Sequence, residues 1–142
     1  MRITFGTDEE TAVTAAVLVH LRAAGHEVEA LPVTSWAAVG RRVGEAVAGG
    51  DAERGVVCCW TGTGVSIAAN KVPGVRAALC TDAETARGAR RWNDANVLAF
   101  GLRLTTEALA VELVDAFLEA GPVDAAERPA IDSLDPDRPP TP

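Results

Sequence analysis

Residues 56–71 read Val-Val-Cys-Cys-Trp-Thr-Gly-Thr-Gly-Val-Ser-Ile-Ala-Ala-Asn-Lys, and they predict the fold class. A short apolar run, Val56-Val57, leads through two cysteines into a glycine-threonine loop, and a helical pattern follows at residues 65–70. A strand, a tight loop and a helix in this order are the first part of a βαβ unit. The stretch therefore favours an α/β fold with functional groups at the end of a strand.

The same stretch combines a thiol with a helix start. Unpaired N–H groups and the helix dipole favour negative charge there, which suits a thiolate, a phosphate or an enediolate oxygen. A tight turn with buried cysteines explains the pattern equally well. Because adjacent strand residues point to opposite faces, Cys58 and Cys59 cannot share one role. We expect Cys58 in the core and Cys80 at the end of a strand, in a structural role.

Outward from this stretch, β-branched runs alternate with segments of helical periodicity. Strands are predicted at residues 2–5, 27–31, 55–59, 76–80 and 96–100, and helices at residues 10–24, 36–48, 65–70, 83–91 and 106–120. Five β-α units in succession predict a parallel sheet with helices on both faces.

In such a sheet, ligands bind beyond the carboxyl ends of the strands. The loop after Cys59 lies at such an end, and so do Asp8 and Glu9, where the first strand meets its helix. These two carboxylates are candidates for acid-base groups or hydroxyl ligands. They are equally candidates for helix capping and first-turn acidity.

Composition narrows the class of function. The chain has 142 residues, a formal net charge of −7 and scattered basic residues, which disfavours nucleic-acid binding. No apolar run approaches the roughly 20 residues of a membrane-spanning helix. Three cysteines without zinc-site spacing and only two histidines disfavour a metal site. We expect a cytoplasmic protein that binds a small molecule, without a metal or cofactor and without membrane contact.

The composition changes after Gly121. Six of the eight prolines follow this residue, among several aspartates and glutamates. This pattern predicts a single domain over residues 1–121 and an extended, partly disordered, proline-rich acidic tail over residues 122–142.

Three blocks carry a family resemblance: Cys59 with residues 61–71, then residues 75–80, and then residues 93–101. In these blocks the chain resembles the type B ribose-5-phosphate isomerases, a family that includes the galactose-6-phosphate isomerase subunits LacA and LacB. The resemblance implies a Rossmann-like three-layer α/β/α sandwich with a five-stranded parallel sheet. It also implies a homodimer, or a tetramer built from it, with active sites at the subunit interface. The implied reaction is metal-free aldose-ketose isomerisation through an enediolate.

The resemblance assigns roles by position. Cys59 matches the base that moves a proton between adjacent carbons, and Thr61 matches a threonine implicated in ring opening. Asp8 lies near the sugar hydroxyls, and Asn93 reaches the site from the partner subunit. The backbone that would stabilise the enediolate oxygen belongs to Gly62, Thr63, Gly64 and Val65.

The departures from the family pattern are concentrated around this site. Glu9 replaces a phosphate-binding histidine, and Trp92 replaces the ring-opening histidine, whose proton transfer an indole cannot perform. Trp36 and Trp60 also fall on positions that surround the family's site. The three tryptophans indicate either a pocket relined with aromatic walls or a pocket filled in.

The family's phosphate-clamping arginines near the C-terminus are also missing, because Arg128 and Arg138 are the only arginines after residue 121. Arg87, Arg90 and Arg91 can either compensate or form a solvated helix face. We therefore predict an isomerase with Cys59 as base and Glu9 as a possible second acid-base group. Its substrate is expected to be a modified or unphosphorylated sugar, already in open-chain form.

Two alternatives remain open. One uses the same enediolate chemistry for dehydration or epimerisation. The other is a catalytically inactive homologue that binds a ligand or partner, which predicts Trp60 packed against Trp92 with no cavity between them.

Overall fold

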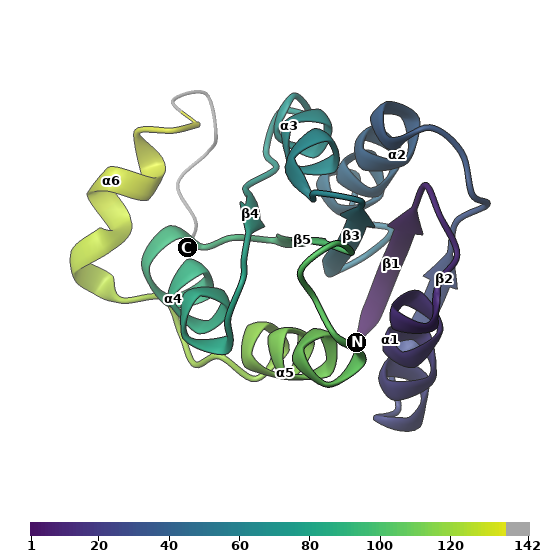
Figure 1. The fold of residues 1–142 in the computed structure, drawn as a ribbon. Coiled ribbons are helices and arrows are strands. Elements are labelled where there is room, and N and C mark those ends of the chain that lie inside the picture. Colours follow the sequence, from purple (N-terminus) through teal and green to yellow (C-terminus); the bar gives the residue numbers. More distant parts are fainter. Residues whose placement is uncertain (136–142) are drawn as a thin grey trace.

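The computed structural model describes residues 1–135 (Figure 1). Strands and helices alternate over most of the chain: β1 Arg2–Thr7, α1 Ala12–Ala23, β2 Glu27–Ala30, α2 Trp36–Ala48, β3 Arg54–Cys59, α3 Thr63–Asn70, β4 Ala77–Leu79, α4 Ala83–Asn93, β5 Val97–Gly101 and α5 Glu107–Leu118. Every element predicted from the sequence is present, with shifts of a few residues at its ends.

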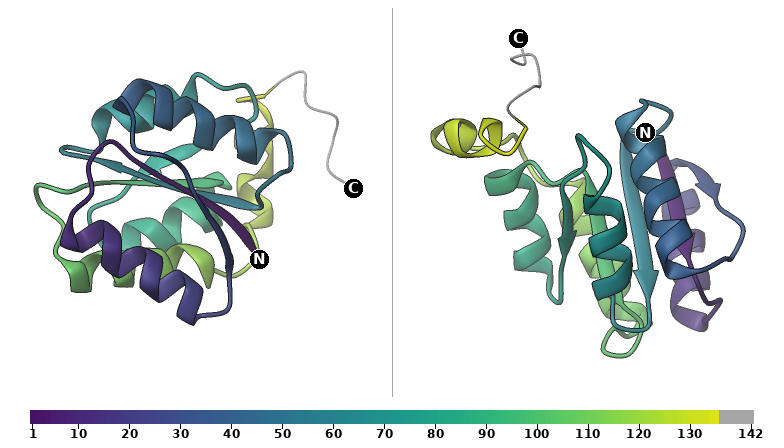
Figure 2. Two further views of the ribbon diagram at one scale, coloured as in Figure 1. Left: turned by 90° about the vertical axis from the view of Figure 1, so that its right-hand side faces the viewer. Right: turned by 90° about the horizontal axis from the view of Figure 1, so that it is seen from above.

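The five strands form one sheet in the order β2-β1-β3-β5-β4, and all pairs are parallel. This confirms the predicted five-stranded parallel sheet. The chain places β5 between β3 and β4, so β4 lies at one edge and β2 at the other. In Figure 1 the carboxyl ends of the strands face the reader. The right-hand view of Figure 2 shows this from above, with the arrowheads pointing toward the front.

Helices cover both faces of the sheet, which gives the three-layer sandwich (Figures 1 and 2). Helices α1, α4 and α5 pack on one face, around a core that includes Phe5, Leu98 and Phe100. Helices α2 and α3 pack on the other face, around Val57 and Val65. The catalytic candidates lie where these two cores meet the carboxyl ends of the central strands.

Local capping explains where most helices begin. Side chains of Thr11, Ser35, Asp82 and Thr106 accept hydrogen bonds from the first turns of α1, α2, α4 and α5. Helix α3 begins at Thr63, two residues earlier than predicted, because Gly62 takes the capping position with a φ of 76°. A left-handed φ of this kind is available to glycine at little cost.

The predicted extended tail is wrong for residues 125–132. A 3₁₀ turn, η1 Ala125–Glu127, leads directly into α6 Arg128–Asp132. Pro129 lies in the first turn of α6, where a proline needs no N–H partner, and Ile131 is buried. Proline content therefore did not exclude a helix here, while residues 136–142 of the predicted tail lie outside the described part of the chain.

Within residues 1–135, no helix is long and apolar enough to cross a membrane.

Candidate functional site

The candidate site lies at the carboxyl ends of β1 and β3, the two central neighbours at which the strand order changes direction. Strand β1 pairs with β2 on one side and with β3 on the other. In an open parallel sheet, ligands usually bind beside the strand ends where the strand order changes direction in this way. The register pairs Thr7 with Cys58, so Asp8 follows β1 at the level of Cys59. Two of the predicted site residues are thus brought together by strand pairing.

The two adjacent cysteines lie on opposite faces of the sheet, as predicted. Cys58 belongs to the core under α1, α4 and α5, and burial raises its pKa to about 12. Burial also raises the pKa of the Cys80 thiol, to about 11. Cys58 and Cys80 therefore remain protonated thiols near neutral pH.

Cys59 lies in the other core, near Val39 and Val65, with 5% of its surface exposed.

The loop after Cys59 is held tightly against β5. A Cβ atom on Gly62 would lie 2.6 Å from the carbonyl carbon of Phe100, and one on Gly101 would lie 2.6 Å from the carbonyl oxygen of Thr61. The backbone N–H of Leu102 donates to the Cys59 carbonyl at 2.9 Å, and that of Arg103 donates to the Trp60 carbonyl at 2.8 Å. This packing fixes the position of the loop and requires glycine at residue 62.

The N-terminus of α3 has no side-chain cap, unlike α1, α2, α4 and α5. Its first intrahelical hydrogen bond runs from the Ser66 N–H to the Gly62 carbonyl at 3.2 Å, so the N–H groups of residues 63–65 precede it. The hydroxyls of Thr61 and Thr63 lie 2.8 Å apart beside them. These donors, together with the helix dipole, suit an oxyanion.

Asp8 carries the one buried side-chain oxygen or nitrogen of residues 1–135 that lacks a hydrogen-bond partner, its Oδ1. Leaving a carboxylate oxygen buried and unpaired is costly, and such groups call for a functional explanation. Glu9 is exposed, and its backbone forms two hydrogen bonds with the Thr7 hydroxyl, at 2.8 and 3.2 Å. The turn after β1 therefore holds one buried acceptor and one exposed carboxylate.

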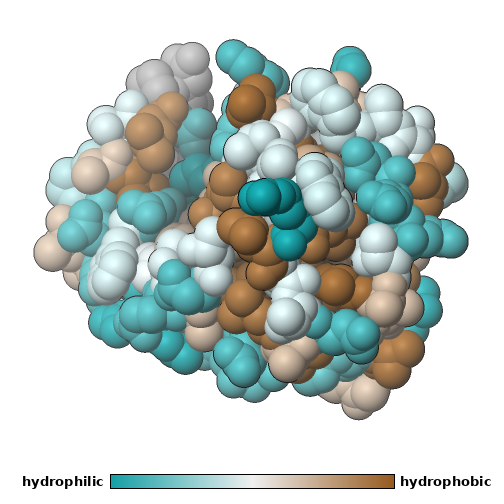
Figure 3. All heavy atoms as spheres, in the orientation of Figure 1, coloured by the Kyte–Doolittle hydropathy of each residue, from teal (hydrophilic) through white to brown (hydrophobic). Residues whose placement is uncertain are grey.

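Two of the three tryptophans lie near the loop. Trp36, at the start of α2, packs against Gly64 in the first turn of α3, where an added Cβ would lie 2.8 Å from the indole. Trp60 borders a cavity of ≈ 240 Å³ together with Thr61. Hydrophobic side chains occupy part of the centre of the molecular face on which the strands end (Figure 3).

Trp92 and Asn93 lie at the other end of the molecule from Cys59. They form the last turn of α4, which leads into the amino end of β5, and the Trp92 ring packs over Gly88. Asn93 borders an open groove of ≈ 530 Å³ with Lys71 and Arg76. Within one chain these two residues do not join Cys59, and the partner-subunit role of Asn93 stays a prediction.

The arginines of α4 have acidic partners. Arg90 is buried and bonds the Asp94 carboxylate at 2.9 Å, while Arg87 and Arg91 pair with Glu84 and Asp124. The alternative of a solvated face therefore fails for Arg90.

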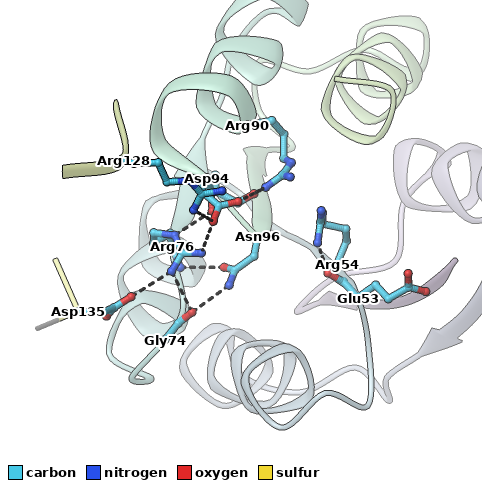
Figure 4. Close-up of polar contacts among 10 residues, drawn as sticks. Glu53, Arg54, Gly74, Arg76, Arg90, Asp94, Asn96, Arg128 and Asp135 are labelled. Atoms are coloured by element: carbon cyan, nitrogen blue, oxygen red, sulfur yellow. Dashed lines mark hydrogen bonds and ion pairs between the residues drawn. The ribbon is translucent and has the colours of Figure 1, made fainter. Parts of the chain in front are cut away.

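Asp94 also binds Arg76, at 3.1 Å, and lies 3.7 Å from Arg128, so that three arginines surround one carboxylate (Figure 4). Arg128, from α6, thus faces an internal ion-pair cluster. Its guanidinium already faces the Asp94 carboxylate, which makes it less available to clamp a phosphate.

Sequence reasoning did not single out Leu79, Arg103 and Leu104, which also border the cavity beside Trp60. Leu79 ends β4, and the other two follow β5, so the strand-end rule could have found them. Among residues 1–135, no group of three or more His, Cys, Asp or Glu side chains is arranged to hold a metal ion.

Comparisons with known proteins show the family and agree with the fold. The model of the Ribose/Galactose Isomerase family matches residues 3–133. Ribose-5-phosphate isomerase B of Escherichia coli is 39% identical over 127 residues, which cover 84% of each chain. The DNA damage-repair/toleration protein DRT102 of Arabidopsis thaliana is 40% identical over 119 residues, which cover 82% of this chain but 38% of the plant protein. The solved structure of Clostridium thermocellum ribose-5-phosphate isomerase B superimposes with a TM-score of 0.91 at 36% identity, over 96% of this chain and 97% of the other.

Proposed function

The chain belongs to the ribose/galactose isomerase family, and we propose that it is an aldose-ketose isomerase. Its substrate is a modified or non-standard sugar or sugar phosphate, and the reaction proceeds through an enediolate without a metal. A base removes a proton from the carbon beside a carbonyl, and the proton returns to the neighbouring carbon. This chemistry needs a base, an oxyanion site and an acid.

Cys59 is the proposed base. The Cys59 thiolate takes the proton from the carbon beside the carbonyl, so that the C–H bond breaks, an S–H bond forms and the electron pair moves onto the carbonyl oxygen to give the enediolate. The thiol then gives a proton, which can first exchange with solvent, to the former carbonyl carbon. The hydroxyl proton of the first carbon moves to the enediolate oxygen, with Glu9 as the proposed acid-base group, and this leaves the new carbonyl on the first carbon. Cys58 and Cys80 are poor candidates because burial raises the pKa of each thiol to about 12 and about 11.

The observation that carries the proposal is the uncapped N-terminus of α3, which follows Cys59 after a short, tightly packed loop. The N–H groups of residues 63–65, reached through the turn at Gly62, would stabilise the enediolate oxygen. Because the loop is already fixed against β5, these donors require no rearrangement during the reaction.

The remaining roles follow from position. Asp8, with its unpaired buried Oδ1, would accept a hydrogen bond from a substrate hydroxyl. Glu9 would serve as a second acid-base group, and the Thr61 hydroxyl would bind the substrate oxygen near the reacting carbons. Trp36 would form a wall of the site. Asn93 and Trp92 would complete the site of a second subunit in a homodimer.

Ordinary ribose 5-phosphate is a poor match. Glu9 is exposed at the site and repels a phosphate dianion, and Arg128 is engaged with Asp94. Arginine forks bind phosphate strongly, and the site residues proposed above include no arginine.

The test is isomer formation, followed by NMR, over a panel of aldoses and ketoses with and without phosphate. We expect the wild-type protein to interconvert at least one pair and Cys59→Ala to lose that activity. Cys80→Ala is the matched control and should retain it. A panel with no conversion would refute the isomerase proposal, and a product lighter by one water would favour dehydration instead.

The inactive alternative predicts that Trp60 packs against Trp92. Within one chain Trp60 borders a cavity of ≈ 240 Å³ and Trp92 lies over Gly88 on α4, so this packing would require Trp92 from a second subunit.

A further inference from the structure

The cavity beside Trp60 has no role in the isomerisation steps described above. It has a volume of ≈ 240 Å³ and lies between the ends of β3, β4 and β5. Thr61 borders it, and the same residue begins the loop to the proposed oxyanion site. The cavity therefore lies beside the loop that leads to the proposed oxyanion site.

Its walls are mainly apolar and exposed. Trp60 is 59% exposed, Leu104 is 70% exposed and Leu79 is 39% exposed, although all three are large hydrophobic side chains. A cluster of exposed apolar side chains around a hollow typically marks a binding site. These three come from separate segments that meet only in the folded chain.

The size of the cavity suits a small apolar group. A dry cavity of about 150 Å³ lined by aliphatic and aromatic side chains accommodates benzene. A cavity of ≈ 240 Å³ therefore has room for a phenyl ring or a short branched alkyl chain.

The polar side chains that border the cavity are those of three threonines and Arg103, and no carboxylate borders it. Most of the exposed surface of the lining is nevertheless apolar. Hydroxyls of a sugar that lie against Trp60 and the two leucines would have no hydrogen-bond partner there. An apolar substituent incurs no such cost.

We propose that this cavity, called here the Trp60 subsite, binds an aryl or short alkyl substituent of the substrate. The substrate class is then an open-chain hydroxyketone or hydroxyaldehyde that carries an apolar group beyond the carbons that isomerise. The proposed reactive part of the substrate rests on the proposed isomerase function. The preference for an apolar substituent rests on the cavity alone.

The test compares two hydroxyketones that are identical except for a terminal phenyl group in one and a methyl group in the other. Binding is measured by calorimetry with Cys59→Ala, so that no reaction is required. Burial of the ring should make the phenyl compound bind at least about tenfold more tightly. Adding Trp60→Gly, or separately Leu104→Ser, should remove most of this difference.

Val19→Ser is the matched control, because Val19 is 67% exposed on α1, away from the cavity. It should leave the phenyl preference unchanged. Equal binding of the two compounds, or a preference that survives Trp60→Gly and Leu104→Ser, would overturn the subsite. So would protection of Trp60 and Leu104 from solvent in a dimer without ligand, because a second copy would then fill the cavity.

Turnover separates the two proposals. If the phenyl compound binds preferentially but the wild-type protein isomerises neither compound nor any sugar, the subsite stands and the isomerase function fails. If sugars are isomerised but the phenyl preference is absent, the function stands and the subsite fails.

Discussion

At the scale of single residues, Cys58 and Cys59 are adjacent in the chain, but their side chains lie on opposite faces of the sheet. The alternation of side chains along β3 sends the two thiols into different cores. This separation was predictable from the sequence, since it follows from strand periodicity alone.

The Cys58 thiol predicts a dependence of stability on pH. Its pKa is raised by burial from 9.0 to about 12, so the folded state holds the proton more tightly than the unfolded state. The stabilisation is therefore complete below pH 9 and is lost as pH rises towards 12. Denaturant unfolding across this range should show a falling free energy of unfolding, and the fall should be smaller in Cys58→Ala. An unchanged slope in that variant would contradict this account.

Gly62 predicts a large cost of substitution. In Gly62→Ala the residue keeps a φ of 76°, and its Cβ would lie 2.6 Å from the Phe100 carbonyl carbon. Left-handed strain and overpacking together should lower the free energy of unfolding by about 2–5 kcal/mol.

Gly74→Ala is the matched control. Its φ is 84°, but nothing lies within 4 Å of the added Cβ, so only the strain of about 1–2 kcal/mol is expected. Equal losses for the two variants in urea unfolding would show that the loop is not tightly packed against β5.

At the scale of elements, the predictable parts are those whose signals are local. Helix α2 spans Trp36–Ala48, as predicted, because Ser35 caps it and its apolar spacing is regular. Strand β4 is shorter than predicted, at Ala77–Leu79. The Asn70 amide bonds both the N–H and the carbonyl of Ala77, at 2.8 and 2.9 Å, at the sheet edge.

Helix α6 and the insertion of β5 between β3 and β4 were not predictable, because tertiary contacts determine both. A five-residue helix has little intrinsic stability, and this one is held by buried Ile131 and by Arg128 near Asp94. Likewise, the sequence predicted Trp60 at the site but could not show whether the indole opens or fills a cavity.

The cluster around Asp94 predicts how α6 and α4 are held together. Asp94→Asn keeps a residue that tolerates the φ of 49° but removes the charge that faces Arg76, Arg90 and Arg128. Because the Asp94 side chain is only 16% exposed, we expect a loss of about 3 kcal/mol in the free energy of unfolding.

Asp124→Asn is the matched control, since it breaks one ion pair with Arg91 in which both side chains are substantially exposed. Its expected cost in thermal or urea unfolding is about 0–1 kcal/mol. A cost for Asp94→Asn as small as this would mean that the cluster contributes little to stability.

At the scale of the whole molecule, Cys59 and Asn93 lie at opposite ends of the sheet within one chain. If two subunits form each site, a mixture of Cys59→Ala and Asn93→Ala subunits should regain activity that neither has alone. After the subunits re-assort at random, half of the dimers contain one intact site of two, so about a quarter of the wild-type activity is expected. Steady-state rates of the mixture measure this, and no recovery would contradict a shared site.

In the proposed mechanism, Cys59 moves a proton through an enediolate. The most direct test is the reaction in deuterium oxide, with NMR used to detect deuterium on the carbon beside the carbonyl of a converted substrate. We expect deuterium incorporation by the wild-type protein and by Cys80→Ala, and none above background by Cys59→Ala. Deuterium incorporation by Cys59→Ala equal to that by the wild-type protein would contradict this mechanism.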